Sequence, residues 1–449
     1  MKSIPISLLI FPLAATAAAR PTSHTRTPNF VIVVADDMGY GDLGCYGNKT
    51  ILTPNVDRMA AEGIRFTDYH SNGAASTPTR AALLTGRYQQ RAGMQGVHMP
   101  WDEATKNVGL QDGEVTFGHV LGQNGYKVAL FGKWHVGTAD YCSPNRRGFE
   151  RFIGFRGANI DYVNHRGVEG DRDWWRDMEQ WDEPGYATDL IASHACNYIR
   201  ENKNVPFCIY VAHAAPHYPY QAPDDVEFRR ENMGKQHQYP TKGHDAAMAY
   251  KAMIERFDKT MGDILASLKE TGLAENTIIF IVSDNGPVGP GSPGALGGKK
   301  GMLLEGGHRV PGIVWGADAY VKGGRDCSET VIGMDIFPTM LDYASIKYNH
   351  ARKPLDGASL RGVIGSGGKA PVRDLFWRNG NSVAIRSGKW KMILYKNGPV
   401  KTLLCDLEAD AGEKTNLADA RAALVDQLTA KIRAWEKSVD SEIKEQINN

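Results

Sequence analysis

The sequence predicts an α/β fold: a large, mostly parallel sheet sandwiched by helices, followed by a smaller C-terminal antiparallel sheet plus a helix. Continuous apolar, β-branched runs such as residues 29–35 and 277–282 are typical of strands buried on both faces of a parallel sheet. Helical patterns lie between these runs. The 449 residues are enough for one large domain and a smaller one.

The first part of the chain, which we place at residues 27–371, is expected to form the large domain. The apolar runs predict buried strands at residues 29–35, 126–131, 207–212, 277–282 and 312–315. The helical patterns begin at residue 53, with a cap at Gly63, and continue over residues 117–121, 186–200 and 250–268. Residues 148–183 show no clear periodicity, which predicts a long loop or insertion.

From about Val372 the pattern changes to short alternating runs. Residues 382–386, 390–395 and 402–406 are typical of antiparallel strands, and residues 418–435 of a final amphipathic helix. We therefore expect a smaller C-terminal α+β subdomain over residues 372–449.

Residues 1–19 have the pattern of a signal peptide. Lys2 supplies a positive charge, residues 4–13 an apolar core and residues 17–19 a small-residue cleavage site. A membrane anchor is the alternative, but the apolar run is too short to span a bilayer and Arg20 interrupts it. We expect an exported protein, periplasmic or secreted, without a membrane anchor.

The composition indicates a soluble globular protein, because 42% of the residues are apolar and the formal net charge is only +1. That charge gives no reason to expect nucleic-acid binding. The six cysteines are scattered without a CxxC pair, which argues against a metal cluster. Export permits disulfides, and the sequence cannot choose among about fifteen full connectivities.

A short helix is expected directly after a stretch of small, turn-forming residues that ends at Pro78. Ser76 would lie at its N-terminus, where free N–H groups and the helix dipole favour an anion. Arg80 can place a permanent charge on the same turn, and Gly86 is a plausible C-cap. Taken alone, Ser76 is better explained as an N-cap, whose side chain satisfies a free N–H group.

Ionisable and amide groups gather directly after the predicted strands. Parallel strands bring their C-terminal ends to one edge of a sheet, so these distant segments can converge there. The groups are Asp36 and Asp37, Lys133 and His135, His213 and His217, and Asp284 and Asn285. An all-oxygen donor set selects a hard cation, and Ca²⁺ suits several carboxylates plus an amide. Such a metal with a ring of cations suits an ester of a tetrahedral oxyanion.

Two further expectations concern residues of this group. Lys133 and His135, two apart in an extended segment, would face the same side and suit one anion. Of the two histidines after residue 212, we expect His217 to do the chemistry and His213 to be a packed or orienting residue.

The pattern Ser76-x-Pro78-x-Arg80, followed by Leu84-Thr85-Gly86, resembles the signature of the type I sulfatases, of the alkaline phosphatase superfamily. The resemblance runs from about residue 27 to the C-terminus. In that family the first position is a Cys or Ser that is converted to formylglycine, whose hydrated aldehyde is the nucleophile. Thr79 stands where Ser or Ala is more usual.

The resemblance implies a role for each matching residue. Asp36, Asp37, Asp284 and Asn285 would bind Ca²⁺ together with the residue at position 76. Arg80 would hold the formylglycine, and Lys133 and Lys300 would bind the sulfate. His217 would bind the substrate and protonate the leaving alcohol, and His135 would assist release of sulfate from the covalent hemiacetal.

Three functions follow from these residues. The first is a formylglycine sulfatase that hydrolyses aryl sulfates or sulfated carbohydrates, and whose Ser76 is modified by a radical-type maturase before export. The second is a metal-dependent phosphoesterase of the same superfamily. Asn285 stands where its two-zinc members typically place His, which argues for one hard metal. The third is a non-catalytic glycan-binding relative.

The substrate depends on the loop within residues 148–183. Its aromatic and basic side chains could stack on sugar rings and meet further anionic groups; they are His165, Arg166, Trp174 and Trp175. Ordinary packing of the loop explains the same residues equally well.

Overall fold

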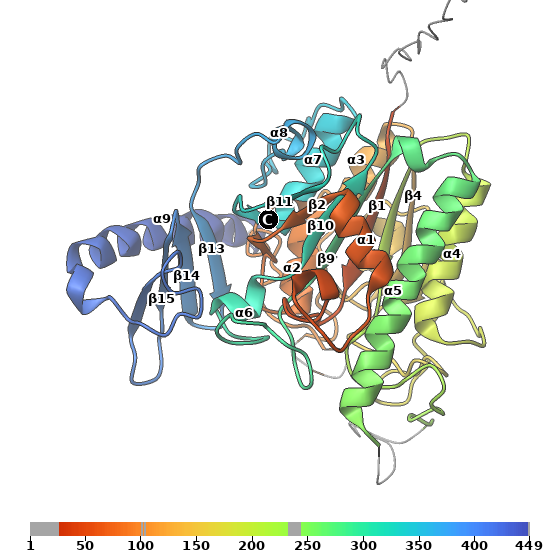
Figure 1. The fold of residues 1–449 in the computed structure, drawn as a ribbon, viewed down its shortest axis with the longest axis horizontal. Helices are drawn as coiled ribbons and strands as arrows, with labels where there is room; N and C mark the ends of the chain where they lie inside the picture. The colour runs from red at the N-terminus through yellow and green to blue at the C-terminus, as the bar shows by residue number, and fades with distance from the viewer. Residues whose placement is uncertain (1–26, 100–101, 103–104, 232–243, 448–449) are drawn as a thin grey trace, which may run out of the picture.

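The computed structural model describes residues 27–99, 102, 105–231 and 244–447. The predicted signal peptide, residues 1–19, lies outside this range. Within it, the predicted α/β architecture is confirmed: one large, mostly parallel sheet lies between two layers of helices, and a smaller antiparallel sheet follows (Figure 1). No helix in the described part of the chain is both long and apolar enough to cross a membrane.

Ten strands of the described residues form the large sheet, in the order β11-β2-β10-β9-β1-β8-β4-β5-β6-β7. Its parallel centre consists of β1 (Asn29–Ala35), β4 (Lys127–Lys133), β5 (Arg151–Phe155), β8 (Phe207–Ala212) and β9 (Thr277–Ser283). On one side β10 (Gly312–Gly316) runs antiparallel to β9, and β2 (Ile64–Phe66) and β11 (Arg325–Cys327) follow it. The short strands β6 (Trp175–Arg176) and β7 (Glu179–Gln180) end the other side.

Strand β1 shows why its run is apolar on both faces. Val31 and Val33 pack into the core beneath α1 (Pro54–Glu62), α4 (Ala187–Glu201) and α5 (Ala246–Glu270). Phe30 and Ile32 pack into the core beneath α2 (Ser76–Thr85), α3 (Phe117–Gln123), α7 (Ile336–Tyr343) and α8 (Arg361–Ser366). Figure 1 shows α4 and α5 side by side along the first of these faces. The helices over residues 186–200 and 250–268 are thereby confirmed.

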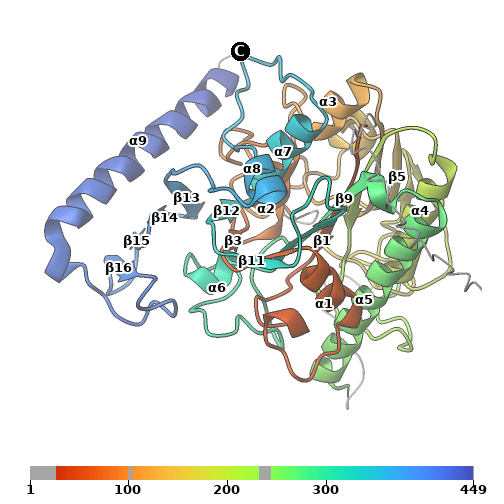
Figure 2. The same cartoon turned by 45° about the horizontal axis from the view of Figure 1, so that its top comes forward.

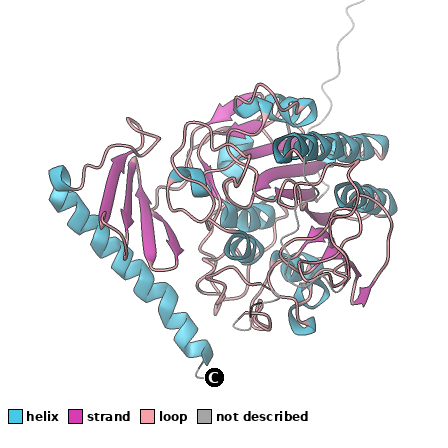
Figure 3. Cartoon of the chain, turned by 90° about the horizontal axis from the view of Figure 1, so that it is seen from below, coloured by secondary structure: helices cyan, strands magenta, loops and turns pink. Residues whose placement is uncertain are grey.

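The smaller sheet consists of β13 (Leu375–Asn379), β14 (Ser382–Ser387), β15 (Trp390–Leu394) and β16 (Thr402–Asp406), all antiparallel. The long helix α9 (Ala422–Ile447) lies across it, as Figure 2 shows. In Figure 3 this sheet and α9 form a lobe beside the main body. Leu303 and Met334 of the main body belong to the same apolar core as this lobe, so the two parts share an interface.

Some elements differ from the prediction. Residues 148–183 are not one loop, because Arg151–Phe155 forms the parallel strand β5; the interruption by Gly154 hides it from an apolar-run search. The short elements β3 (Tyr69–His70), β12 (Val331–Ile332) and α6 (Glu305–His308) were not predicted, nor were β2, β11, β13, α7 and α8. All six cysteines lie in the described residues, and each is free.

Candidate active site

The predicted site residues converge at the C-terminal edge of the parallel strands. Strands β1, β4, β8 and β9 are neighbours in the sheet and run in the same direction. The segments after them therefore open onto one edge, where α2 also begins. The structure places nine predicted residues there, each within contact of another member of the group: Asp36, Asp37, Ser76, Arg80, Lys133, His135, His217, Asp284 and Asn285, and Lys300 joins them from a later loop.

Asp36, Asp37, Asp284 and Asn285 form a buried oxygen-rich cluster, each residue at most 3% exposed. Asp37 has a left-handed backbone with φ of 65°, a conformation that is uncommon for residues other than glycine. Among the described residues, one oxygen of Asp36 and the amide oxygen of Asn285 are buried without a hydrogen-bond partner. Such orphaned acceptors carry a desolvation cost unless a cation meets them, so this donor set fits a hard divalent ion.

The charges in the cluster are unevenly balanced. Burial raises the pKa of Asp36 well above its usual value, although Lys133 lies beside it. Burial also opposes the charge of Asp37, but Lys300 and His217 hold its pKa below the usual range. Against the same burial, Arg80 and Lys133 hold the pKa of Asp284 low. Asp36 is thus the carboxylate that most needs further positive charge.

Ser76 is the first residue of α2, and Ala75 occupies the N-cap position without a side-chain cap. The N-cap interpretation of Ser76 is therefore wrong. Its Oγ instead accepts a hydrogen bond of 2.9 Å from Nε of Arg80, one turn later, and lies 3.0 Å from Nδ1 of His135. Arg80 also donates to Asp284, at 2.9 Å from its terminal nitrogen. Gly86 caps the helix with φ of 67°, as predicted.

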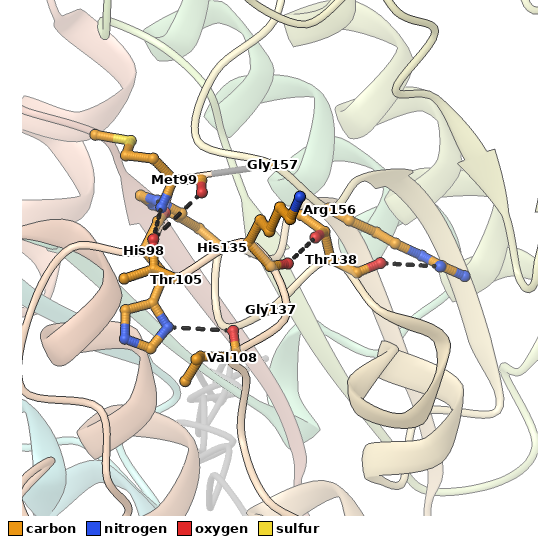
Figure 4. A pocket seen from close by; sticks show the side chains of 10 residues that line it. His98, Met99, Thr105, Val108, His135, Gly137, Thr138, Arg156 and Gly157 are labelled. Carbon is orange, nitrogen blue, oxygen red and sulfur yellow. Dashed lines mark hydrogen bonds between the residues drawn. The ribbon is translucent and has the colours of Figure 1, made fainter. Parts of the chain in front are cut away.

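His135 has φ of 54°, so the segment after β4 is not extended as predicted. Lys133 and His135 consequently reach different partners: Nζ of Lys133 donates to Asp36 at 2.6 Å, while the His135 ring faces Ser76. The other ring nitrogen, Nε2, lies 3.0 Å from the backbone oxygen of His98 (Figure 4). A carbonyl can only accept, so Nε2 carries the proton and Nδ1 is left as an acceptor facing the Ser76 hydroxyl.

Burial, together with Lys133, lowers the pKa of His135 well below its usual value. A neutral imidazole whose bare nitrogen faces a hydroxyl is arranged as a general base. The contribution of His98 was not predicted, since it acts through its backbone oxygen, for which a sequence carries no signal.

His217 lies beside Asp37, with Nε2 3.5 Å from Oδ2 of that carboxylate. Its Nδ1 lies 2.7 Å from the backbone oxygen of Tyr218, so Nδ1 donates and Nε2 faces the site. Burial lowers the pKa of His217 to about 3. One oxygen each of Asp36 and Asp37 and a ring nitrogen of His217 lie within 4.8 Å of one another.

His213 is separate from this site. It is fully buried and packs edge-to-face on Phe257 at 5.1 Å, with Thr260 3.4 Å from Nε2. The structure thus agrees with the packed role expected for it.

Lys300, rather than the exposed Lys299, reaches the site: its Nζ donates to Oδ1 of Asp37 at 2.6 Å. The segment that carries it is fixed by glycines. A Cβ on Gly286, directly after Asn285, would lie 1.8 Å from the backbone oxygen of Gly306. Only glycine permits this approach, which places the loop that carries Lys300 beside the oxygen cluster.

A second buried polar group, not predicted, connects this loop to the C-terminal lobe. Nζ of Lys391 lies 2.9 Å from both Glu305 and Nε2 of His308, and His308 Nδ1 lies 3.0 Å from Nδ1 of His70. Glu413 accepts from the backbone N–H of Glu305 at 2.5 Å. His70, Glu305 and His308 have the spacing of a metal site. The ammonium of Lys391 already supplies a positive charge to this group.

The structure of the loop after β5 bears on whether its aromatic residues stack on sugar rings or pack within the loop. His165 and Trp174 are buried and stack on each other at 4.4 Å, and Trp174 donates to Glu183. Arg166 donates to the backbone oxygen of Gly170 at 2.7 Å, and Arg156 lies over Trp175 at 3.7 Å. The rings of His165 and Trp174 thus serve packing of the loop, and the half-buried Trp175 is covered on one face by Arg156.

Comparison with known proteins identifies the family. The sulfatase family model matches residues 28–346. Steryl-sulfatase of Rattus norvegicus is 30% identical, over 80% of this chain and 73% of its own length. Arylsulfatase A of Homo sapiens is 29% identical, over 92% of this chain and 86% of its own. The crystal structure of Ps i-CgsB in complex with k-i-k-neocarrahexaose is similar in fold, with a TM-score of 0.81, 28% identity and coverage of 91% of this chain and 93% of that one.

The family match covers most of the chain, and the relatives it resembles are sulfuric ester hydrolases by name. This chain belongs to the sulfatase family, as a type I sulfatase of the alkaline phosphatase superfamily.

Proposed function

We propose that this sulfatase hydrolyses sulfate esters of carbohydrates, with a formylglycine derived from Ser76 as nucleophile and one Ca²⁺ beside it. The observation that carries the proposal is the position of the Ser76 Oγ, held between Arg80 and the acceptor nitrogen of His135 at the edge of a buried carboxylate cluster. A hydrated aldehyde at this position supplies a nucleophilic hydroxyl and a second hydroxyl whose proton a base can remove.

The proposed Ca²⁺ ligands are the oxygens of the buried cluster, namely Asp36, Asp37, Asp284, Asn285 and the residue at position 76. When bound, the ion supplies positive charge that stabilises an oxyanion. The orphaned oxygens of Asp36 and Asn285 support this assignment.

Three cations are assigned to the nucleophile and the sulfate. Arg80 orients the residue at position 76, to which it already donates. Lys133 and Lys300 bind the sulfate oxygens; both ammonium groups now neutralise carboxylates of the proposed metal site, at 2.6 Å. A calcium ion on those carboxylates makes the ammonium groups available to an incoming anion.

The two histidines move the protons. Nδ1 of His135 takes a proton from the hydroxyl at position 76, because Nε2 is committed to the His98 carbonyl. Nε2 of His217, which faces the site, delivers a proton to the oxygen of the leaving alcohol. The negative charge of a bound sulfate ester favours the protonated ring that this step needs.

Sulfated carbohydrates are proposed as substrates, with aryl sulfates as small probes. The support is the similarity to Ps i-CgsB, whose structure contains a bound hexaose.

We further propose that a radical-type maturase modifies Ser76 before export, that the mature protein is periplasmic or secreted, and that the catalytic domain ends at residue 371.

The test compares protein made with and without the maturase, assayed on 4-nitrophenyl sulfate and a panel of sulfated saccharides. We expect the unmodified protein to fold, bind calcium and be nearly inactive. With the maturase, the peptide containing residue 76 should become lighter by two hydrogens, and activity should rise with that fraction. Chelation should remove activity and Ca²⁺ should restore it.

Ser76→Ala made with the maturase is the control and should remain inactive. Full sulfatase turnover by protein whose residue-76 peptide contains only unmodified serine would contradict the proposal. It would favour the phosphoesterase, and assays on phosphate esters would then test that function. Two zinc ions and no calcium in the active protein would overturn the metal assignment.

A further inference from the structure

A cavity of about 330 Å³ lies beyond the C-terminal ends of β4 and β5. Most of its wall comes from the segment after β5, which runs from Arg156 to Gln180, and Thr138 of the segment after β4 completes it. Its volume lies in the range of cavities that bind small molecules.

This cavity adjoins the catalytic residues. Thr138, Arg156 and Gly157 also line the smaller cavity of Figure 4, to which His135 contributes. The backbone N–H of His135 donates to the Arg156 oxygen at 3.2 Å. Since Thr138 is three residues from His135, their Cα atoms are at most about 11 Å apart. The larger cavity therefore lies beside the wall to which His135 contributes, within the reach of a sugar chain whose sulfated ring is held at Ser76.

Two buried charged groups of the cavity wall are already engaged within the protein, and the exposed Arg172 lies 3.7 Å from the carboxylate of Asp182. Arg156 donates to Asp140 at 2.7 Å while lying over the ring of Trp175. Asp173 accepts from the backbone N–H groups of Arg156 and Gly157 and from the Trp175 indole. Arg156 is 2% exposed, and among the described residues its Nε has no hydrogen-bond partner. These residues shape the wall rather than offer free charge.

The exposed charges of the wall are two carboxylates, Glu169 and Asp171, and one guanidinium, Arg172. Together they have a net charge of about −1, which opposes a sulfate group. Sugar hydroxyls suit the same groups, because each hydroxyl can donate to a carboxylate and accept from a guanidinium. With Trp174 buried and Trp175 covered by Arg156, recognition here uses hydrogen bonds and not ring stacking.

We propose that this cavity binds an uncharged sugar ring, adjacent to the ring that carries the sulfate ester to be hydrolysed. The proposal rests on the proposed function as a carbohydrate sulfatase. It makes the enzyme selective for partly sulfated chains, in which the neighbouring ring carries no sulfate.

The test is the double variant Glu169→Ala/Arg172→Ala in the matured, calcium-loaded protein. Both side chains are exposed, so the fold should be retained. On the best oligosaccharide of the saccharide panel, kcat/KM should fall at least about tenfold, the effect of losing one or two hydrogen bonds. On 4-nitrophenyl sulfate, which cannot reach the cavity, kcat/KM should stay within about twofold.

The matched control is Glu179→Ala/Arg176→Ala, which makes the same charge changes at exposed positions of the β6–β7 hairpin outside this cavity. It should leave both substrates unaffected. A second comparison uses oligosaccharides that differ only in sulfation of the neighbouring ring: the parent enzyme should prefer the unsulfated form, and the cavity variant should lose that preference.

Equal kinetics of the cavity variant and the parent on oligosaccharides would overturn the sugar site and leave the sulfatase assignment intact. A preference of the parent enzyme for oligosaccharides whose neighbouring ring is sulfated would overturn the proposal that the cavity binds an uncharged ring. If the matured enzyme cleaves 4-nitrophenyl sulfate but no sulfated oligosaccharide, the carbohydrate assignment and the sugar site are both wrong.

Discussion

At Ser76 the local sequence favours one role and the tertiary environment imposes another. A serine before a helix ordinarily satisfies a free backbone N–H group. Here the Oγ is used by Arg80 and His135 instead, and Ala75 occupies the cap position. A helix start that forgoes its cap is a local cost, and such costs are found where a side chain is needed for function. His135 and Asp37, both with positive φ, show the same feature at the same edge.

For His217 the geometry predicts a dependence on the leaving group. His217→Ala should slow hydrolysis of sugar sulfates by about 10²–10⁴-fold, because alkoxides leave poorly without a proton. Hydrolysis of 4-nitrophenyl sulfate should be affected much less, since nitrophenolate leaves easily. The measurement is kcat on both substrates with the matured variant. Equal losses on the two would indicate that His217 only binds substrate.

For His213 the burial predicts a dependence of stability on pH. Burial lowers the pKa of His213 to about 3, against about 6.5 in an unfolded chain. Below pH 6.5 the unfolded chain binds a proton that the folded protein does not. The free energy of unfolding should therefore fall, as pH decreases, by about 1.4 kcal/mol per pH unit from this group, and be unaffected above pH 7.

His213→Gln removes the titrating group. Between about pH 6.5 and pH 5, the unfolding free energy of this variant should therefore decrease by about 2 kcal/mol less than the unfolding free energy of the parent. Urea unfolding at these two pH values, with calcium present throughout, measures the difference. If the unfolding free energies of the two proteins changed equally with pH, protonation of His213 in the unfolded chain would not be the cause of the pH dependence.

At the scale of elements, the site depends on how loops are held over the sheet edge. The loop after β9 returns so closely that Gly286 and Gly306 meet backbone to backbone, while the N–H of Gly286 donates to Gly307 at 2.9 Å. Asn285 and Lys300 take their positions from this contact. The positions of these site residues therefore depend on backbone packing between loops as well as on side-chain contacts.

Gly286→Ala should force α6 away from Asn285, because the added methyl group has no space. We expect a loss of about 1–3 kcal/mol in unfolding free energy and a larger proportional loss of calcium affinity and kcat. Gly362→Ala is the matched control: it lies in α8 with open space around its Cα, and should be neutral or slightly stabilising. Calorimetric calcium titration and urea unfolding of both variants give the comparison; unchanged calcium binding in Gly286→Ala would contradict the argument.

At the scale of the whole molecule, the C-terminal lobe contributes to the active-site loop through a buried ion pair. Lys391 of β15 bonds Glu305 and His308, whose short helix follows the Lys300 loop directly. Ser71, at the start of the segment that leads to Ser76, donates through its backbone N–H to the oxygen of His308 at 2.7 Å. The lobe is thereby connected to both the loop that carries Lys300 and the segment that leads to Ser76.

Lys391→Met should destabilise the protein by up to about 3–5 kcal/mol, because it removes the cation nearest to the buried Glu305 carboxylate and leaves only Arg309 and Arg386, at 3.5 and 3.6 Å. Lys389→Met, two residues before Lys391, removes a partly exposed lysine that pairs with Asp406, and it should change little. Urea unfolding measures the effect, and kcat on 4-nitrophenyl sulfate at a temperature where both variants are folded tests the coupling to the site. Equal stability of the two variants would show that the buried pair is not a link between the lobes.

By itself, the sequence determined the α/β class, the buried strands, the long helices and the ionisable residues at the strand ends. These properties are local, because an apolar β-branched run needs burial on both faces and parallel strands must share an edge. β5 was missed because Gly154 interrupts its apolar run, and the short edge strands were missed because their pairing partners lie far away in the sequence.

Only the tertiary structure decided what each side chain contacts. It assigned the Ser76 Oγ to Arg80 and His135, the aromatic loop to packing, and the His70–Glu305–His308–Lys391 group to the interface between the lobes. The physical reason is that these contacts join residues distant in the chain, and their energies depend on burial and orientation, which composition and spacing do not specify.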